Sequence, residues 1–260
     1  MLHKDGNLYA LRANAISGTE ISHVTFGFRE AFIPNGDLTP RRSCKEILDA
    51  DPSAPSGVYS VTVDGWTQRV YCDMSYSGGG WTVVARSQKT GGHTFEDRSI
   101  VGNSGWQEYT QTGYGQPFAD AAIFFAPLEF WHRFTNTLSN VQFQERTSES
   151  SGNWCGMTDY VVYAETHSQP YGYDYGSRLG GCTGTSNIIY RGRGHGFTTH
   201  DDDNDSWTSN CASQNGGMRG GWWYESCYQN SMWHDNGNIY ALRSNTQHSV
   251  NLLEILLRES

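Results

Sequence analysis

An acidic run near the C-terminal end of the chain holds the residues whose types and spacing could do chemistry. Residues 200–211 read HDDDNDSWTSNC, and four aspartates fall within the five positions 201–205. Carboxylates this close repel one another unless a cation lies among them, and calcium is held by about six to eight oxygen ligands. Asp203 and Asp205 flank a single residue, so their side chains can converge on one ion. The run predicts a calcium site or, from acid clustering alone, a solvated loop.

An EF-hand calcium loop, a zinc site and enzymatic chemistry are all disfavoured. An EF-hand beginning at Asp201 would need glycine and glutamate where the chain has Ser206 and Ala212. For zinc, His195 and His200 lack helical i,i+4 spacing, and no cysteine pair supports them. No GxSxG elbow, HExxH helix, phosphate-binding loop or dinucleotide fingerprint occurs. We therefore expect a protein that is not an enzyme.

Composition limits the class of protein. The 260 residues suffice for one large domain or two small ones with a real core. The net charge is −9 and the longest basic stretch is Arg41-Arg42, which argues against nucleic-acid binding. No run of about 18 apolar residues occurs, so no membrane span is expected. The N-terminal residues lack the apolar stretch of a signal peptide; a signal for export would have been removed, lie upstream or be of another type.

The cysteines indicate an oxidising compartment. None has CxxC spacing, which excludes zinc-ribbon and redox motifs. An even number at wide spacing favours three disulfides in a secreted protein, and six reduced thiols in a cytosolic protein are the alternative. The cysteines are Cys44, Cys72, Cys155, Cys182, Cys211 and Cys227.

The elements that would position the acidic run are predicted from hydrophobic patterning. We expect helices over 44–48 and within 127–138, and strands over 57–63, 69–74, 81–86, 141–146, 160–165 and 250–257. After residue 170 the chain is rich in Gly, Asp, Asn, Ser and Tyr with little periodicity, which is typical of an ordered functional loop system.

Residues 1–40 form a separate, strand-rich N-terminal extension in this prediction. Residues 5–12 resemble residues 237–243, which suggests head-to-tail copies, so the extension could be the tail of a preceding repeat. Pairing of the two segments with each other, or chance, are the alternatives. The main domain is expected over 41–260.

Several motifs together resemble the fibrinogen-like recognition domain, the C-terminal globular domain of fibrinogen, ficolins and tachylectins. The motifs are SCKEIL at 43–48, PSGVY at 55–59, VYCDM at 70–74, GGGWTVV at 78–84, FTTHDDDND at 197–205, NCA at 210–212 and GWWYESC at 221–227. The resemblance implies an α+β fold with a small N-terminal disulfide subdomain, a central twisted antiparallel sheet with short helices, and a loop-rich calcium- and ligand-binding subdomain.

The resemblance also implies disulfides and a calcium (Ca2+) site. The implied pairs are Cys44–Cys72 and Cys211–Cys227, with Cys155–Cys182 as an additional pair. Carried over by position, Asp203 and Asp205 supply carboxylates, and Trp207 and Ser209 supply backbone carbonyls. Asp201 and Asp202 would then be outer or solvated charges.

In many relatives a pocket beside the calcium binds acetyl groups of sugars, and the peptide before the second cysteine is often cis. The equivalent peptide here is Ser226–Cys227. The implied ligand-binding residues are Cys211, Trp223, Tyr224, Ser226, Cys227, Tyr228 and His234. Tyr228 stands where histidine is common, and a later segment that helps wall the pocket is missing, so a different sugar specificity is expected. Core packing is the favoured role for Trp222 and Trp223, and ligand contact is the alternative.

The predicted function is a calcium-dependent lectin that binds glycans or glycoproteins, acetylated sugars among them, through the loops at 200–236. Because single lectin sites are weak, a homo-oligomer or a tandem or fibre assembly is expected. The alternative is a protein-binding adhesion or assembly module, or the receptor-binding tip of a viral or phage fibre, with structural calcium. Either function predicts a secreted, extracellular or particle-surface protein.

Overall fold

The structure is a computed structural model that describes residues 39–89, 104–148, 155–180, 192–213, 220–225, 227, 232, 239–243 and 246–260. All of them lie within one compact unit, Ile33–Ser260. The predicted extension at 1–40 therefore lies outside the described residues except for Thr39 and Pro40, and the predicted domain boundary stays a prediction.

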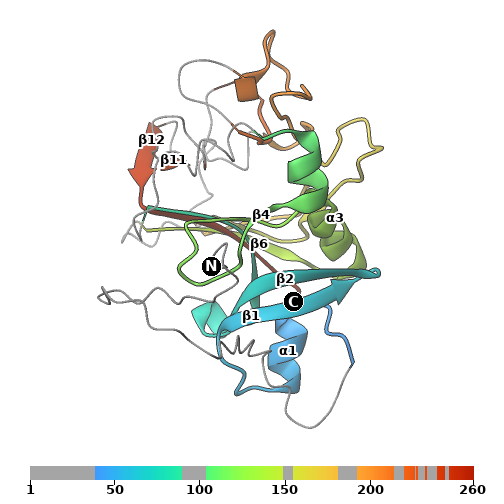
Figure 1. Cartoon of the computed structure of the whole chain (residues 1–260), viewed down its shortest axis with the longest axis vertical. Coiled ribbons are helices and arrows are strands. Elements are labelled where there is room, and N and C mark those ends of the chain that lie inside the picture. Colours follow the sequence, from blue (N-terminus) through green and yellow to red (C-terminus); the bar gives the residue numbers. More distant parts are fainter. Residues whose placement is uncertain are drawn as a thin grey trace, which may run out of the picture. The chain divides into compact units, whose positions relative to one another are not determined.

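One antiparallel sheet organises the described part of the chain (Figure 1). Its strands follow the order β1-β2-β3-β13-β6-β7-β10, and β5 joins β3 and carries β4. The strands are β1 (Gly57–Val63), β2 (Trp66–Asp73), β3 (Trp81–Gln88), β4 (Tyr114–Gly115), β5 (Ile123–Phe125), β6 (Gln142–Thr147), β7 (Cys155–Met157), β10 (Arg178–Gly180) and β13 (Leu252–Arg258). Together with the helices, this sheet confirms the predicted α+β fold.

Smaller elements surround the sheet. The helices are α1 (Cys44–Ala50) and α3 (Leu128–Thr137), and the short helical turns are η2 (Tyr76–Gly78), η3 (Glu108–Thr112) and η5 (Cys211–Ser213). Two strand pairs are separate from the sheet: β8 (Val161–Val162) with β9 (Tyr173–Asp174), and β11 (Ile239–Arg243) with β12 (Thr246–Val250). No helix among the described residues is long and apolar enough to cross a membrane.

The predicted N-terminal disulfide subdomain is formed by α1 and the β1–β2 pair. Ser43 caps α1 by accepting the backbone N–H of Glu46 at 3.0 Å, which satisfies a donor that the helix itself cannot pair. The Cys44–Cys72 disulfide then joins α1 to β2. The helix runs two residues beyond the predicted 44–48 and ends before Pro52.

A buried network of ion pairs connects the central strands of the sheet. Glu254 on β13 lies in register with Arg86 on β3 and with Arg146 on β6. Its Oε1 is 2.5 Å from Arg86 Nη2 and its Oε2 is 2.6 Å from Arg146 Nε. A second carboxylate, Asp73 on β2, accepts from Arg146 Nη1 at 2.8 Å. Because each buried charge has an opposite partner, the desolvation penalty of burial is offset.

Two predicted strands need correction. The strand expected over 250–257 is broken at Asn251, because Val250 ends β12, which pairs with β11, whereas Leu252 begins β13, which pairs with β3 and β6. The strand expected over 160–165 is reduced to Val161–Val162, because Tyr163 already donates its N–H to Gly172 in a loop. The segment 237–243 contributes β11, and its counterpart at 5–12 lies outside the described residues.

Candidate functional site

A buried aromatic cluster supports the acidic run from beneath. Thr198, just before the run, and Trp222 exchange backbone hydrogen bonds of 2.8 and 3.0 Å, which join this part of the chain to the GWWY segment. The Trp223 ring packs edge-on against Phe197 at 5.0 Å between centroids, and its Nε1 donates to Tyr171 O at 2.7 Å. This cluster gives the loop a rigid base.

Trp222, Trp223 and Tyr224 are core residues. Their exposed fractions are 3%, 2% and 1%. The Tyr224 hydroxyl is also satisfied internally, because it donates to Gly220 O at 2.8 Å. The structure thus favours the packing role for these rings over an open ligand wall, although ligand contact at Trp223 and Tyr224 was also expected.

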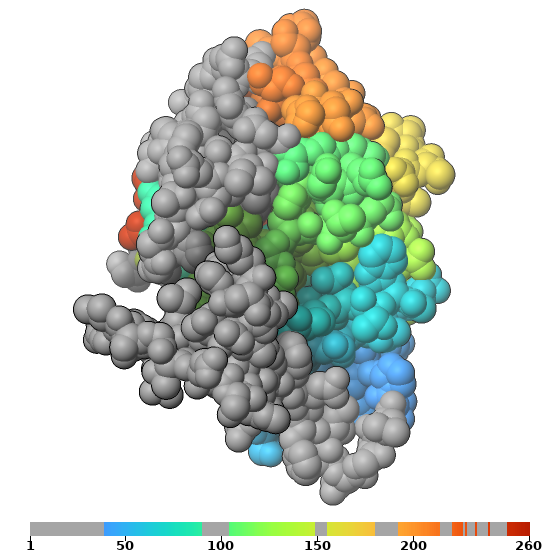
Figure 2. Space-filling view, in the orientation of Figure 1, coloured from blue at the N-terminus to red at the C-terminus, as the bar shows by residue number. Residues whose placement is uncertain are grey.

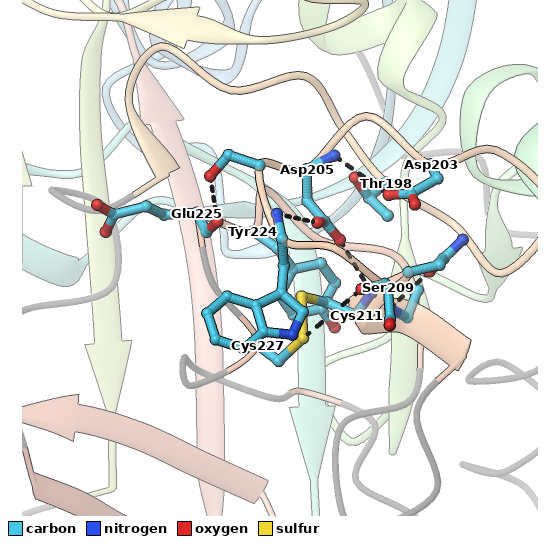
Figure 3. Close-up of a disulfide and its surroundings, with 12 residues drawn as sticks. Thr198, Asp203, Asp205, Ser209, Cys211, Tyr224, Glu225 and Cys227 are labelled. Atoms are coloured by element: carbon cyan, nitrogen blue, oxygen red, sulfur yellow. Dashed lines mark hydrogen bonds between the residues drawn. A yellow bond between two sulfur atoms is a disulfide. The ribbon is translucent and has the colours of Figure 1, made fainter.

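Asp205 organises the loop that follows it. One carboxylate oxygen accepts the backbone N–H of Trp207 at 2.8 Å, and the other accepts the backbone N–H of Cys211 at 2.9 Å (Figure 3). The Asp205 N–H in turn lies 3.4 Å from Asp203 Oδ1. Asn204 anchors the run to the core by donating its side-chain amide to Phe197 O at 2.9 Å. The loop is therefore closed by side chain-to-backbone bonds.

The electrostatics of this loop suit a cation. Burial raises the pKa of Asp205 and the nearby charge of Asp203 adds to the rise, although the N–H bonds from Cys211 and Trp207 act in the opposite direction. A divalent cation between the two carboxylates would remove their repulsion. No described group of three or more His, Cys, Asp or Glu side chains could hold a metal, but the predicted set has only two carboxylates and takes its other ligands from carbonyls. That donor set fits calcium.

A disulfide fastens the end of the run. Cys211 is bonded to Cys227, with 4.8 Å between their Cα atoms, and the Ser209 carbonyl oxygen lies 4.0 Å from Cys227 Sγ. Cys155 is also disulfide-bonded. Both pairs that the resemblance implies are thus present, and such bonds agree with an oxidising, extracellular compartment. The predicted partner Cys182 lies outside the described residues.

Three predicted ligand residues cannot be placed. Ser226, Tyr228 and His234 lie outside the described residues, as does the Ser226–Cys227 peptide for which a cis bond was considered. Cys211 is described, but its backbone N–H already donates to Asp205. The acetyl pocket therefore stays a prediction.

Trp207 is the exposed aromatic residue of the loop, and the sequence predicted a role only for its carbonyl. Its side chain is 52% exposed, and the other large apolar side chain exposed among the described residues is Phe118 at 45%. The segment 192–213 that carries it (orange in Figure 2) lies at the molecular surface. An exposed tryptophan on a backbone held by Asp205 is suited to binding another molecule.

Asp201 makes a contact that the sequence did not predict. Its Oδ1 accepts the backbone N–H of Trp106 at 2.8 Å and the Thr199 hydroxyl at 2.6 Å. Burial by itself would raise the pKa of Asp201, but these hydrogen bonds outweigh burial and lower it. The expectation of an outer, solvated charge is therefore incomplete, since Asp201 joins the acidic run to a distant segment.

Comparison with known proteins identifies the family. Residues 40–253 match the model of the C-terminal globular domain of fibrinogen beta and gamma chains. Among curated proteins, angiopoietin-2 of Rattus norvegicus is 29% identical over 221 residues, covering 82% of this chain and 39% of that protein. Angiopoietin-1 of Homo sapiens is 30% identical over 214 residues, covering 79% and 37%. The chain thus spans well under half the length of these relatives.

Solved structures show the same fold. The fibrinogen-like globe domain of human ANGPTL6 aligns with a TM-score of 0.66 at 24% identity, covering 85% of this chain and 96% of that one. Lamprey fibrin D-dimer aligns with a TM-score of 0.63 at 17% identity, covering 85% and 74%. The family match extends from the first disulfide to β13, and the sheet and both implied disulfides agree with it. The chain belongs to the fibrinogen C-terminal globular domain family.

Proposed function

We propose that this chain is a non-enzymatic extracellular recognition module that binds a protein partner through the loop at 200–213, with calcium holding that loop in place. The observation that carries the proposal is the 52% exposed Trp207 side chain on a loop that Asp205 fixes to the backbone. Tryptophan is enriched among the few residues that dominate binding energy at protein interfaces.

Calcium has a structural role in this proposal. Asp203 and Asp205 would bind it through carboxylates, and Trp207 and Ser209 through backbone carbonyls. The ion supplies positive charge that neutralises two neighbouring carboxylates. The residues of the chain already close the loop through hydrogen bonds from Trp207 and Cys211 to Asp205, so the ion would bind a loop whose main turns exist before it arrives.

The buried rings favour a protein over a sugar as the partner. Sugar binding in this region was expected to use some of the local aromatic rings as walls, but Trp222, Trp223 and Tyr224 are all core residues. The fourth such ring, Tyr228, lies outside the described residues. One structural relative, lamprey fibrin, is complexed with the peptide ligand Gly-His-Arg-Pro-amide, and the curated relatives are angiopoietins. A lectin is the second candidate, because an exposed tryptophan such as Trp207 can also stack on a sugar ring.

One experiment separates the two candidates. The chain is displayed as a tetramer, so that weak sites gain avidity, and is applied with calcium to an array of extracellular receptor ectodomains and to a glycan array. We expect ectodomain binding that falls about tenfold or more in Trp207→Ala and is unchanged in Phe118→Ala, the matched exposed aromatic. Binding to glycans alone would establish the lectin. Ectodomain binding that is unchanged in Trp207→Ala would refute the loop at 200–213 as the binding surface.

A further inference from the structure

Asp201 connects the acidic run to a segment 95 residues earlier in the chain. Its Oδ1 accepts the Trp106 backbone N–H at 2.8 Å. Its Oδ2 lies against Gly105 so closely that a Cβ built on that glycine would be 2.3 Å from the oxygen. Both carboxylate oxygens are therefore seated against Gly105–Trp106, and a side chain at position 105 would push the Asp201 carboxylate out of this position.

A second, apolar contact joins the same two segments. Tyr109, in the turn that follows Trp106, packs against Phe197 with 5.3 Å between ring centroids. Phe197 lies three residues before His200, the first residue of the acidic run. The 105–109 segment therefore contacts Asp201 within the run and also Phe197 in the aromatic cluster that supports the run.

Trp106 extends the connection to a third segment. Its indole Nε1 donates to Glu165 Oε1 at 2.8 Å, and its ring lies 5.8 Å from that of Tyr171. Tyr171 O is in turn the acceptor for the Trp223 indole. The position of Trp106 is thus set by groups outside the acidic run, and Asp201 is the carboxylate that ties the run to it.

We propose that Asp201 is a positioning residue for calcium binding: by docking on Gly105–Trp106 it places Asp203 and Asp205 for the ion without touching the ion itself. The inference rests on the calcium site of the proposed function. A loop already docked loses less conformational entropy when the ion binds. Thermodynamic linkage makes the effect reciprocal, so calcium must also strengthen the contact between Asp201 and Trp106.

Gly105→Ala tests the docking without changing any charge or any calcium ligand. The added methyl group pushes against the Asp201 carboxylate, and we expect calcium affinity measured by calorimetry to fall about tenfold. Gly57→Ala is the matched control, because a Cβ there meets only Tyr59 at an ordinary 3.8 Å, and its affinity should equal that of the unaltered chain.

A second set of variants separates docking from charge. Asp202→Asn removes one negative charge beside the ion and leaves the Trp106 contact intact. Asp201→Asn removes the same charge but keeps an Oδ1 acceptor, so its affinity should match that of Asp202→Asn. Asp201→Ala removes both the charge and the acceptor, and it should bind calcium about tenfold more weakly than either asparagine variant. Equal affinity for Asp201→Ala and Asp202→Asn would show that Asp201 acts only as a charge.

Hydrogen exchange at residues 104–112 provides the reciprocal readout. Calcium should slow exchange of the Trp106 amide in the unaltered chain and should do so much less in Gly105→Ala, whereas a merely structural contact would be protected equally with and without the ion. If the unaltered chain binds no calcium, the calcium part of the proposed function fails, and the inference with it. If it binds and Gly105→Ala binds equally well, only the inference is overturned.

Discussion

The carboxylate of Asp205 accepts the backbone N–H of Cys211 at 2.9 Å. A predicted calcium ligand is thereby attached to a residue of the Cys211–Cys227 disulfide. The disulfide and the loop are therefore structurally coupled, and we expect loss of the disulfide to alter calcium binding by the loop.

The calcium site itself gives the first prediction. Calorimetric titration of calcium into the chelated chain should show one saturating site, and Asp203→Ala/Asp205→Ala should abolish it, because both carboxylates are removed. A matched Asp49→Ala/Asp51→Ala variant, which removes two carboxylates at the C-terminal end of α1, should bind calcium as the unaltered chain does. No heat and no thermal shift in the unaltered chain would mean a solvated acidic loop.

Removing the second disulfide should weaken calcium binding. Cys211→Ser/Cys227→Ser frees the Cys211 backbone that Asp205 holds, and it should also lower the free energy of unfolding by about 3 kcal/mol. Cys44→Ser/Cys72→Ser should destabilise the fold comparably but leave calcium affinity unchanged, since that disulfide joins α1 to β2. Calorimetry with thermal melting measures both quantities, and equal calcium affinity in all three proteins would disprove the coupling.

Asp73 should make stability depend on acid pH. Burial would raise its pKa, but hydrogen bonds from Arg146 and from the N–H groups of Tyr76 and Ser75 outweigh burial and lower it. A lowered folded-state pKa contributes stability above the unfolded value of 3.8 that is lost as pH falls through the folded value. Asp73→Asn should therefore cost about 2 kcal/mol at pH about 7 and far less at pH about 2. Urea unfolding at both pH values would show a pH-independent difference if this is wrong.

Glu254 should be the most costly carboxylate to neutralise. Its side chain is 1% exposed and contacts Arg86 and Arg146 together, so Glu254→Gln leaves buried positive charge uncompensated and should cost about 3 kcal/mol. Glu46→Gln, which breaks the exposed pair with Arg42, should change stability by less than about 1 kcal/mol. Similar losses in the two variants by chemical denaturation would contradict the buried network.

Two tryptophans of the same region should differ sharply in their response to the same substitution. Trp223→Phe leaves Tyr171 O without its 2.7 Å donor and opens space in the core, so it should cost about 3 kcal/mol. Trp207→Phe, on the surface, should change the free energy of unfolding by less than about 0.5 kcal/mol. Thermal unfolding distinguishes them, and a large loss at Trp207 would mean that its ring is packed.

The hydrophobic pattern of the sequence correctly predicted those elements in which the buried residues recur at the spacing of a single strand or helix. The alternation in 57–63 matches β1, and the apolar side of the predicted 127–138 helix, with Leu128, Trp131 and Phe134, is buried in α3. The break at Asn251 was missed, because 250–257 is a nearly continuous apolar segment and only the pairing partners of β12 and β13 divide it.

The sequence by itself identified the family, because its motifs depend on residue types at fixed spacing along the chain, and the resemblance then implied the Cys44–Cys72 and Cys211–Cys227 disulfides that the structure contains. It also named the carboxylates proposed to hold calcium. Only the tertiary structure decided that Trp223 is buried while Trp207 is exposed, and that Asp201 docks on Trp106. Spacing reports neighbours along the chain, whereas burial and docking depend on which distant segments the fold brings into contact.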